Sequence, residues 1–113
     1  MHQEPRLRVL RDSIQLIELL RPVAAGLRRD NRDLADQLRR AAQSIPLNIA
    51  EGVASDDGNR RARWKTALGS TYEVRAALAV AAAWGELDEA RVARLDEALD
   101  FIAARLWRML HAR

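Results

Sequence analysis

Apolar residues recur along this chain every three or four positions, as they do in helices, and no stretch alternates apolar and polar residues as a strand does. The pattern predicts four helices: one over residues 7–27, a second after an N-cap at Asp30, a third from about Asn59 to Trp84, and a fourth from Asp88. Four helices with short connections predict an all-α, antiparallel up-down-up-down four-helix bundle, as a single domain over residues 1–113.

Each predicted helix has a seam of apolar residues that should face the core. The second helix carries Leu34, Leu38, Ala41, Ile45 and Ile49, and the fourth carries a heptad seam of Val92, Leu95, Leu99, Ile102, Leu106 and Met109. The first carries two adjacent seams, Leu7, Leu10, Ile14 and Ile17 beside Val9, Leu16, Leu20, Val23 and Leu27, which predict a broad buried face. Pro22 should kink that helix or open a new turn. The stretch 52–58 should form a turn, and Gly85 should end the third helix in a left-handed conformation.

The third helix contains one stretch that is apolar on every side, AALAVAAAW at residues 76–84. A helix of a four-helix bundle normally keeps one face in water, so we expect the excess apolar face to contact another subunit. The alternative is tight packing through the small alanines inside one chain.

Composition excludes several classes of protein. The 113 residues are 49% apolar and 31% charged, which is typical of a globular domain. No apolar run is long enough to span a membrane, and the charged beginning does not resemble a signal peptide, so the cytoplasm is the expected location. Cysteine is absent and the two histidines, His2 and His111, lie near the ends, so we expect no metal and no cofactor.

Two motifs in the middle of the chain resemble a known family. Residues 44–52 read SIPLNIAEG and follow the QLRRAA stretch at 37–42, while Ala67, Gly69, Ser70 and Glu73 supply a later A-x-G-S-x-x-E pattern. These motifs are similar to those of the S23-type proteins, a four-helix-bundle family first found in intervening sequences of bacterial 23S ribosomal RNA genes. The chain departs from the family pattern at Arg63-Trp64, where an aromatic-leucine pair is usual, and at Pro22.

The resemblance implies a non-enzymatic, cytoplasmic, bacterial homo-oligomer. Relatives form rings of five, and one branch, the accessory variability proteins of diversity-generating retroelements, partners a reverse transcriptase and its RNA. The motif residues that we carry over as structural are Ser44, Pro46, Asn48, Glu51, Gly52, Gly69, Ser70 and Glu73.

The first motif can also be interpreted from its chemistry. Pro46 inside a helix frees the carbonyl of Ala42, and Ser44 and Asn48 can repair that loss or reach another helix. For antiparallel second and third helices, residue numbers of facing positions should sum to about 112, which places Ser44 opposite Leu68 and Gly69, where the glycine allows close approach. The same rule pairs Glu51 with Arg60 and Arg61, Gln37 with Arg75, and Glu73 with Arg39.

The rival interpretation is a catalytic or ligand site built from Asn48, Glu51, Ser70 and Glu73. A nucleophilic serine needs a nearby base, and no histidine lies away from the ends of the chain. The two glutamates do not face each other under the pairing rule, so we predict no catalytic residues and no enzyme.

Charge is unevenly divided between the two ends of the predicted bundle. The end that holds both termini and the 52–58 turn carries ten basic and six acidic residues, or +4, and the other end nine and ten, or −1. Arg60, Arg61 and Arg63 crowd the positive start of the third helix, an unfavourable placement that indicates an anionic partner such as phosphate. The candidate nucleic-acid-binding residues are Arg60, Arg61, Arg63, Lys65, Arg105 and Arg108. With few aromatics nearby, sequence-independent binding of RNA or an RNA–protein complex is expected; the alternatives are an ordinary solvated arginine face and a protein-interaction adaptor without nucleic acid.

Overall fold

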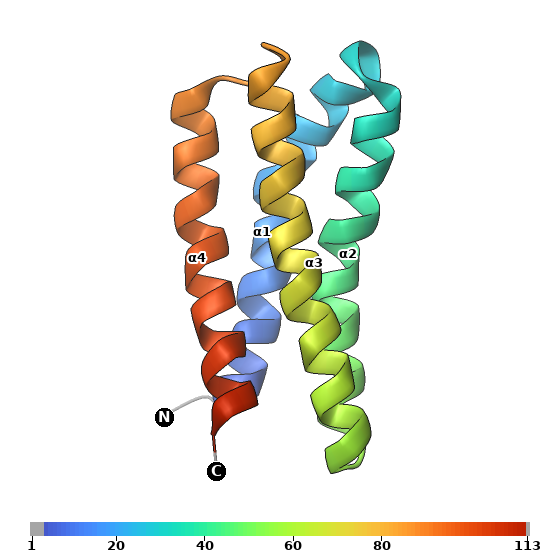
Figure 1. The fold of residues 1–113 in the computed structure, drawn as a ribbon, viewed down its shortest axis with the longest axis vertical. Helices are drawn as coiled ribbons and strands as arrows, with labels where there is room; N and C mark the ends of the chain where they lie inside the picture. The colour runs from blue at the N-terminus through green and yellow to red at the C-terminus, as the bar shows by residue number, and fades with distance from the viewer. Residues whose placement is uncertain (1–3, 113) are drawn as a thin grey trace.

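The protein is described here by a computed structural model, which places residues 4–112. These residues form four helices, α1 (Pro5–Asp30), α2 (Arg32–Ala54), α3 (Asp57–Ala83) and α4 (Glu89–His111). Each helix packs against the next one along the chain, and α4 packs back against α1. Successive helices run in opposite directions (Figure 1), which confirms the predicted antiparallel up-down-up-down bundle.

The two ends of the bundle are built differently. The α1–α2 and α3–α4 connections lie at one end, and the α2–α3 connection lies at the other, together with the start of α1 and the end of α4 (Figure 1). We call this second end the basic pole. The gathering of these three segments confirms the arrangement on which the predicted charge asymmetry depends. His2 and Arg113 lie outside the described residues.

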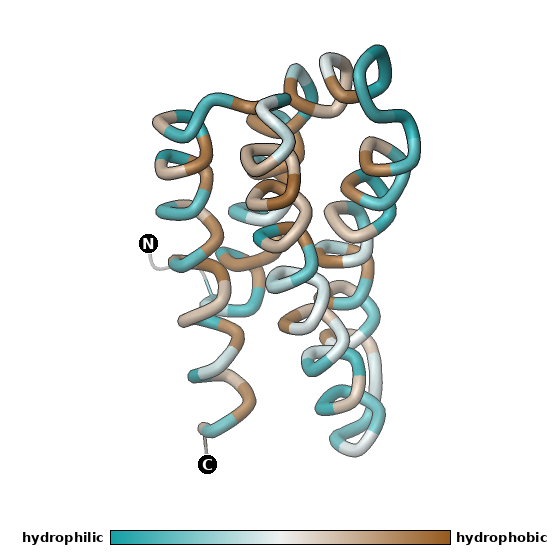
Figure 2. Tube along the Cα trace, turned by 45° about the horizontal axis from the view of Figure 1, so that its top comes forward, coloured by the Kyte–Doolittle hydropathy of each residue, from teal (hydrophilic) through white to brown (hydrophobic). Residues whose placement is uncertain are grey.

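The core runs along the axis of the bundle, where the apolar seams of the helices meet (Figure 2). The predicted α2 seam is fully buried, as are the four central residues of the α4 seam, and Val92 and Met109 pack half-buried at its ends. Each large aliphatic side chain buried in this way contributes about 1.5–3 kcal/mol relative to exposure. The core residues with no measurable exposure include Val9, Ile45, Ile49, Val74, Leu78, Leu99 and Leu106.

Only one of the two predicted α1 seams is fully buried, the one from Val9 to Leu27. On the other seam Leu10 and Ile17 pack half-buried against the core, whereas Leu7 is 42% and Ile14 is 48% exposed. A helix in a four-helix ring covers only the arc that faces its two neighbours, so the expectation of one broad buried face was wrong. Helix α1 also continues without a break through Pro22, which opens no new turn.

The helix ends follow capping chemistry, with two corrections to the predicted boundaries. Asn31, not Asp30, caps α2 by accepting a hydrogen bond from the Leu34 amide at 3.2 Å. The predicted 52–58 turn is only Ser55 and Asp56, because both flanking glycines lie inside helices. Gly85 has φ 75° and ends α3 as predicted, and its amide and that of the next residue bond to the Ala82 and Ala81 carbonyls.

The apolar stretch at the end of α3 is divided between core and solvent. Ala77, Leu78 and Ala81 are buried, whereas Val80 is 44% and Trp84 is 72% exposed. The expected excess of apolar surface is therefore present on a single chain. No helix among residues 4–112 is long and apolar enough to cross a membrane.

Candidate functional site

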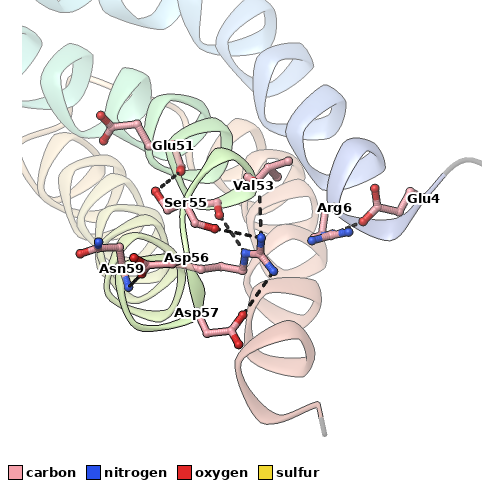
Figure 3. Close-up of polar contacts among 10 residues, drawn as sticks. Glu4, Arg6, Glu51, Val53, Ser55, Asp56, Asp57 and Asn59 are labelled. Carbon is pink, nitrogen blue, oxygen red and sulfur yellow. Dashed lines mark hydrogen bonds and ion pairs between the residues drawn. The ribbon is translucent and has the colours of Figure 1, made fainter.

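Arg60, on the first turn of α3, closes the carboxyl end of α2. Its guanidinium donates hydrogen bonds to the carbonyls of Gly52 at 3.0 Å, Val53 at 3.4 Å and Ser55 at 3.0 Å (Figure 3). It also forms an ion pair with Asp57 at 3.7 Å. The last carbonyls of a helix have no partner within it and carry partial negative charge. Arg60 therefore stabilises the fold, and the expectation that its position is unfavourable was wrong.

The other two arginines at this end of α3 also have partners within the chain. Arg61 donates a hydrogen bond to the carbonyl of Leu110, near the end of α4, and Arg63 forms an ion pair with Glu51 at 3.2 Å. Arg61 thus links α3 to a second helix carboxyl end. The cluster that seemed to need an external anion is largely satisfied by helix carbonyls and acids of the same chain.

The predicted pairing between α2 and α3 was wrong by about two positions. Glu51 pairs with Arg63 rather than with Arg60 or Arg61, and Ser44 contacts Ser70 rather than Leu68 or Gly69. Side chains of a helix lean toward its amino end, so each surface position is covered by the residue about one place further along the chain. In an antiparallel pair this shift applies to both helices, so facing residue numbers sum to two more than expected.

Two further predicted pairs do not form. Arg75 turns toward α4, where it pairs with Asp100 at 2.6 Å and Asp96 at 3.7 Å, so it does not face Gln37. Glu73 lies with Gln37 on the α2–α3 face, whereas Arg39 lies on the α1–α2 face. Arg75 therefore faces α4 and Arg39 lies on the α1–α2 face, whereas the pairing rule had placed both between α2 and α3.

Three of the cations at the basic pole remain available. Lys65, Arg108 and Arg8 are exposed, and none has a hydrogen bond or ion pair within residues 4–112. Arg105, by contrast, is only 17% exposed; it lies 4.0 Å from Asp12, and its guanidinium packs 4.4 Å from the centre of the Phe101 ring. Among the six predicted binding residues, Lys65 and Arg108 are thus the ones without a structural role.

The SIPLNIAEG motif forms a hydrogen-bonded contact between α2 and α3. The Ser70 hydroxyl on α3 donates to the Ser44 hydroxyl at 2.8 Å, and the Asn48 amide donates to the Ser44 hydroxyl at 3.0 Å and to its carbonyl at 2.9 Å. Pro46 is buried inside α2 and does not end it. The motif is therefore built as a polar helix–helix contact, as its structural interpretation predicts, with the Ser44 carbonyl rather than that of Ala42 receiving the side-chain bond.

Close approach of the two helices occurs at Gly52 rather than at Gly69. A Cβ atom at Gly52 would overlap with the indole of Trp64, which is 7% exposed, whereas a Cβ at Gly69 would meet nothing within 4 Å. The guanidinium of Arg60 lies over the Trp64 ring, 5.9 Å from its centre. The departure from the family pattern at Trp64 is thus accommodated by the absence of a side chain at position 52.

The polar groups do not assemble into a reaction centre. The hydroxyls of Ser44 and Ser70 bond to each other, and Glu51 is engaged by Arg63. His111 lies at the end of α4, stacked on Trp107 with ring centroids 3.9 Å apart. Within residues 4–112 there is also no cluster of three His, Cys, Asp or Glu side chains that could hold a metal ion.

The sequence interpretation missed a groove between α1 and α2. This groove has a volume of about 380 Å³ and an apolar floor, and three arginines line it without any acid: Arg21, Arg28 and Arg39. The signal was present in the sequence, because Leu7, Ile14, Arg21 and Arg28 follow one another every seven residues along one side of α1. Summing the charge over each half of the bundle did not reveal this groove, because acidic residues elsewhere in the same half offset the positive charge of these arginines.

Comparison with known proteins places this architecture in a family. The family model of the 23S rRNA-intervening sequence proteins matches residues 5–108, from the start of α1 to the last turn of α4. No curated protein is similar enough in sequence to count as a match. Because the family model covers nearly the whole bundle, the chain belongs to the 23S rRNA-intervening sequence protein family.

Proposed function

We propose that this protein is a non-enzymatic homo-oligomer that binds RNA, alone or in an RNA–protein complex, through phosphate contacts from the basic pole. The observation that carries the proposal is the meeting of three chain segments at one end, where Lys65, Arg108 and Arg8 have no acidic partner among the described residues. The family name adds support, because it ties these proteins to ribosomal RNA genes.

The proposed contacts are electrostatic and independent of base sequence. Flexible, exposed cations neutralise phosphates and release counterions, which gives affinity without reading bases. Trp64 is buried against Gly52, so it offers no platform for base stacking at this pole. Arg60, Arg61 and Arg105 hold the helix ends and the α1–α4 contact in place, and thereby fix the surface from which the free cations project.

Oligomer symmetry would multiply these few contacts. Two or three cations per chain give weak binding, but several poles on one assembly raise the effective concentration for each further contact. The resemblance implies a ring of five, and it also implies a reverse transcriptase as the protein partner. The proposed compartment is the cytoplasm.

A salt titration tests the proposal. Binding of a fluorescent RNA hairpin is measured by anisotropy at several salt concentrations for the wild type and for the Lys65→Ala/Arg108→Ala variant. Removing two phosphate contacts per chain should weaken binding and make the log–log salt slope shallower by roughly 1–2. The matched control is Arg91→Ala/Arg94→Ala, which removes two arginines near the opposite end.

The circular dichroism spectra of both variants should match the wild type, since none of the four side chains has a hydrogen bond or ion pair within residues 4–112. An unchanged affinity and slope in the Lys65/Arg108 variant, or an equal loss in the control, would contradict RNA binding at the basic pole.

A protein-interaction adaptor is the second candidate, and exposed apolar surface favours it. Large hydrophobic side chains that are at least 42% exposed occur on all four helices or their ends: Leu7, Ile14, Leu19, Leu47, Tyr72, Val80, Trp84, Phe101 and Trp107. Recovery of the protein from nuclease-treated lysate separates the two candidates. A partner protein that stays bound after nuclease treatment supports the adaptor. If, in addition, no RNA cross-links to the protein in untreated lysate, the result counts against RNA binding.

A further inference from the structure

We propose that two neighbouring faces of the bundle form the interface between copies of this chain: the α1–α2 groove of one copy receives the α2–α3 face of the next. This inference rests on the homo-oligomer of the proposed function and supplies its contact surfaces. It involves no RNA and lies in the half of the bundle away from the basic pole, so it can be tested separately.

The α1–α2 groove is apolar inside and positively charged at its rim. Ile17, Leu20 and Leu38 contribute to its floor, and Arg21, Arg28 and Arg39 line it. All three arginines are exposed, and none has an ion pair or hydrogen bond among the described residues. An apolar groove with unpaired guanidinium groups fits a protein surface that carries carboxylates around an apolar centre.

The α2–α3 face of the same chain has that composition. A shallow groove of about 330 Å³ is lined there by Asp33 and Glu73 around Ala76 and Val80, with no basic residue. Both acids are exposed without an ion pair within residues 4–112, and Val80 is 44% exposed. The small Ala76 allows close approach of another helix. This face includes the start of the 76–84 stretch, whose exposed apolar surface is expected to contact another subunit.

The rival acidic face of the bundle is less suited to the arginine groove. Between α1 and α4, Asp12 and Glu97 lie beside exposed Phe101. There, however, Arg105 lies 4.0 Å from Asp12 and packs on the Phe101 ring, so one of the two carboxylates is already compensated and an approaching arginine would be repelled by Arg105. Of these two faces, the α2–α3 face is the one on which both carboxylates lack an ion pair within residues 4–112, whereas on the α1–α4 face only Glu97 does.

The position of the two faces determines the type of assembly. They lie on the same half of the bundle, because the groove uses the second half of α1 and the α2–α3 face uses the second half of α3. Their surfaces differ, so the contact is heterologous, and each copy has one free face of each kind. Because the faces adjoin along α2 instead of lying on opposite sides, successive copies turn in one direction, which favours a closed ring over a straight fibre.

Charge reversal with restoration tests the interface. Sedimentation velocity without RNA is run on the wild type, on the groove variant Arg21→Glu/Arg39→Glu, and on the face variant Asp33→Arg/Glu73→Arg. The wild type should associate, and each variant should raise the dissociation constant by roughly tenfold or more per reversed pair. The chain that carries all four substitutions again has opposite charges on its two faces and should regain association.

The control is Arg91→Glu/Arg94→Glu, which reverses two exposed or half-exposed arginines on α4 and should leave association unchanged. Circular dichroism confirms that each variant is folded. A wild type that stays monomeric at every concentration, a reversed variant that associates like the wild type, or a folded fourfold variant that stays monomeric would each overturn the interface. Failure of RNA binding alone would leave it standing, since the RNA test changes only Lys65 and Arg108.

Discussion

The indole of Trp64 on α3 occupies the space that a side chain at position 52 of α2 would need. Both residues are buried, so the conflict cannot be relieved into solvent. The Gly52→Ala variant should therefore lose about 1–3 kcal/mol of unfolding free energy, because the indole must move out of a packed site. Urea denaturation followed by circular dichroism measures the loss.

Gly26→Ala is the matched control for this substitution. Gly26 also lies inside a helix, but a Cβ there meets nothing within 4 Å, so alanine should stabilise the protein by up to about 1 kcal/mol through helix propensity alone. If both alanine variants shift stability in the same direction, the close contact with Trp64 is not what excludes a side chain at position 52.

The capping role of Arg60 predicts a loss of stability when it is removed. Arg60→Ala leaves the carbonyls of Gly52, Val53 and Ser55 without their side-chain donor, and should cost about 1–2 kcal/mol. Lys65→Ala, five residues further along α3, removes a cation with no hydrogen bond or ion pair among the described residues and should stay within about 0.5 kcal/mol of the wild type. Thermal denaturation compares the two, and equal effects would mean that the α2 end needs no cap.

The hydroxyl pair between α2 and α3 predicts energetic coupling. A double-mutant cycle with Ser44→Ala and Ser70→Ala isolates the 2.8 Å hydrogen bond, and the coupling energy should be about 0.5–1.5 kcal/mol. Ser44→Ala should cost more than Ser70→Ala, because the Ser44 hydroxyl also accepts from Asn48 at 3.0 Å. Strictly additive single effects would show that the contact does not join the helices.

Replacement by alanine should have opposite effects on stability at Gly85, just after the end of α3, and at Gly69, inside this helix. Gly85 has φ 75°, a conformation that costs a non-glycine residue about 1–2 kcal/mol, so Gly85→Ala should destabilise the protein by about 1 kcal/mol. Gly69 lies inside α3 with open space around it, so Gly69→Ala should raise stability by up to about 1 kcal/mol. Denaturation midpoints check both signs, and a stabilising Gly85→Ala would contradict the left-handed cap.

The number of helices and their order could be predicted from the sequence because they depend on apolar spacing and on a few capping residues. The α2 and α4 seams and the start of α4 at Asp88 were predicted correctly for this reason. The register between α2 and α3 was not, because it depends on the direction in which side chains lean, which counting along the chain ignores. The exposure of Ile14 was missed because periodicity shows which residues share a face but not how much of that face a neighbour covers.

The candidate site was harder to predict than the fold. The gathering of arginines at one pole followed from topology, but the partners of Arg60 and Arg61 are backbone carbonyls at helix ends, and a sequence does not show these as charges. Counting ionisable side chains therefore overstated the free positive charge of this pole. The same counting concealed the groove formed by Arg21, Arg28 and Arg39, whose charge is local to one face.

The connection of α2 to α3 consists of only Ser55 and Asp56, and these two helices share the most extensive packing in the bundle, whereas α1 and α4 pack least among the four pairs of neighbouring helices. A short loop closes with little loss of chain entropy, so the central hairpin should be the folding nucleus. Amide hydrogens along α2 and α3 should then exchange most slowly with deuterium, and transient opening should begin where the first and last helices meet.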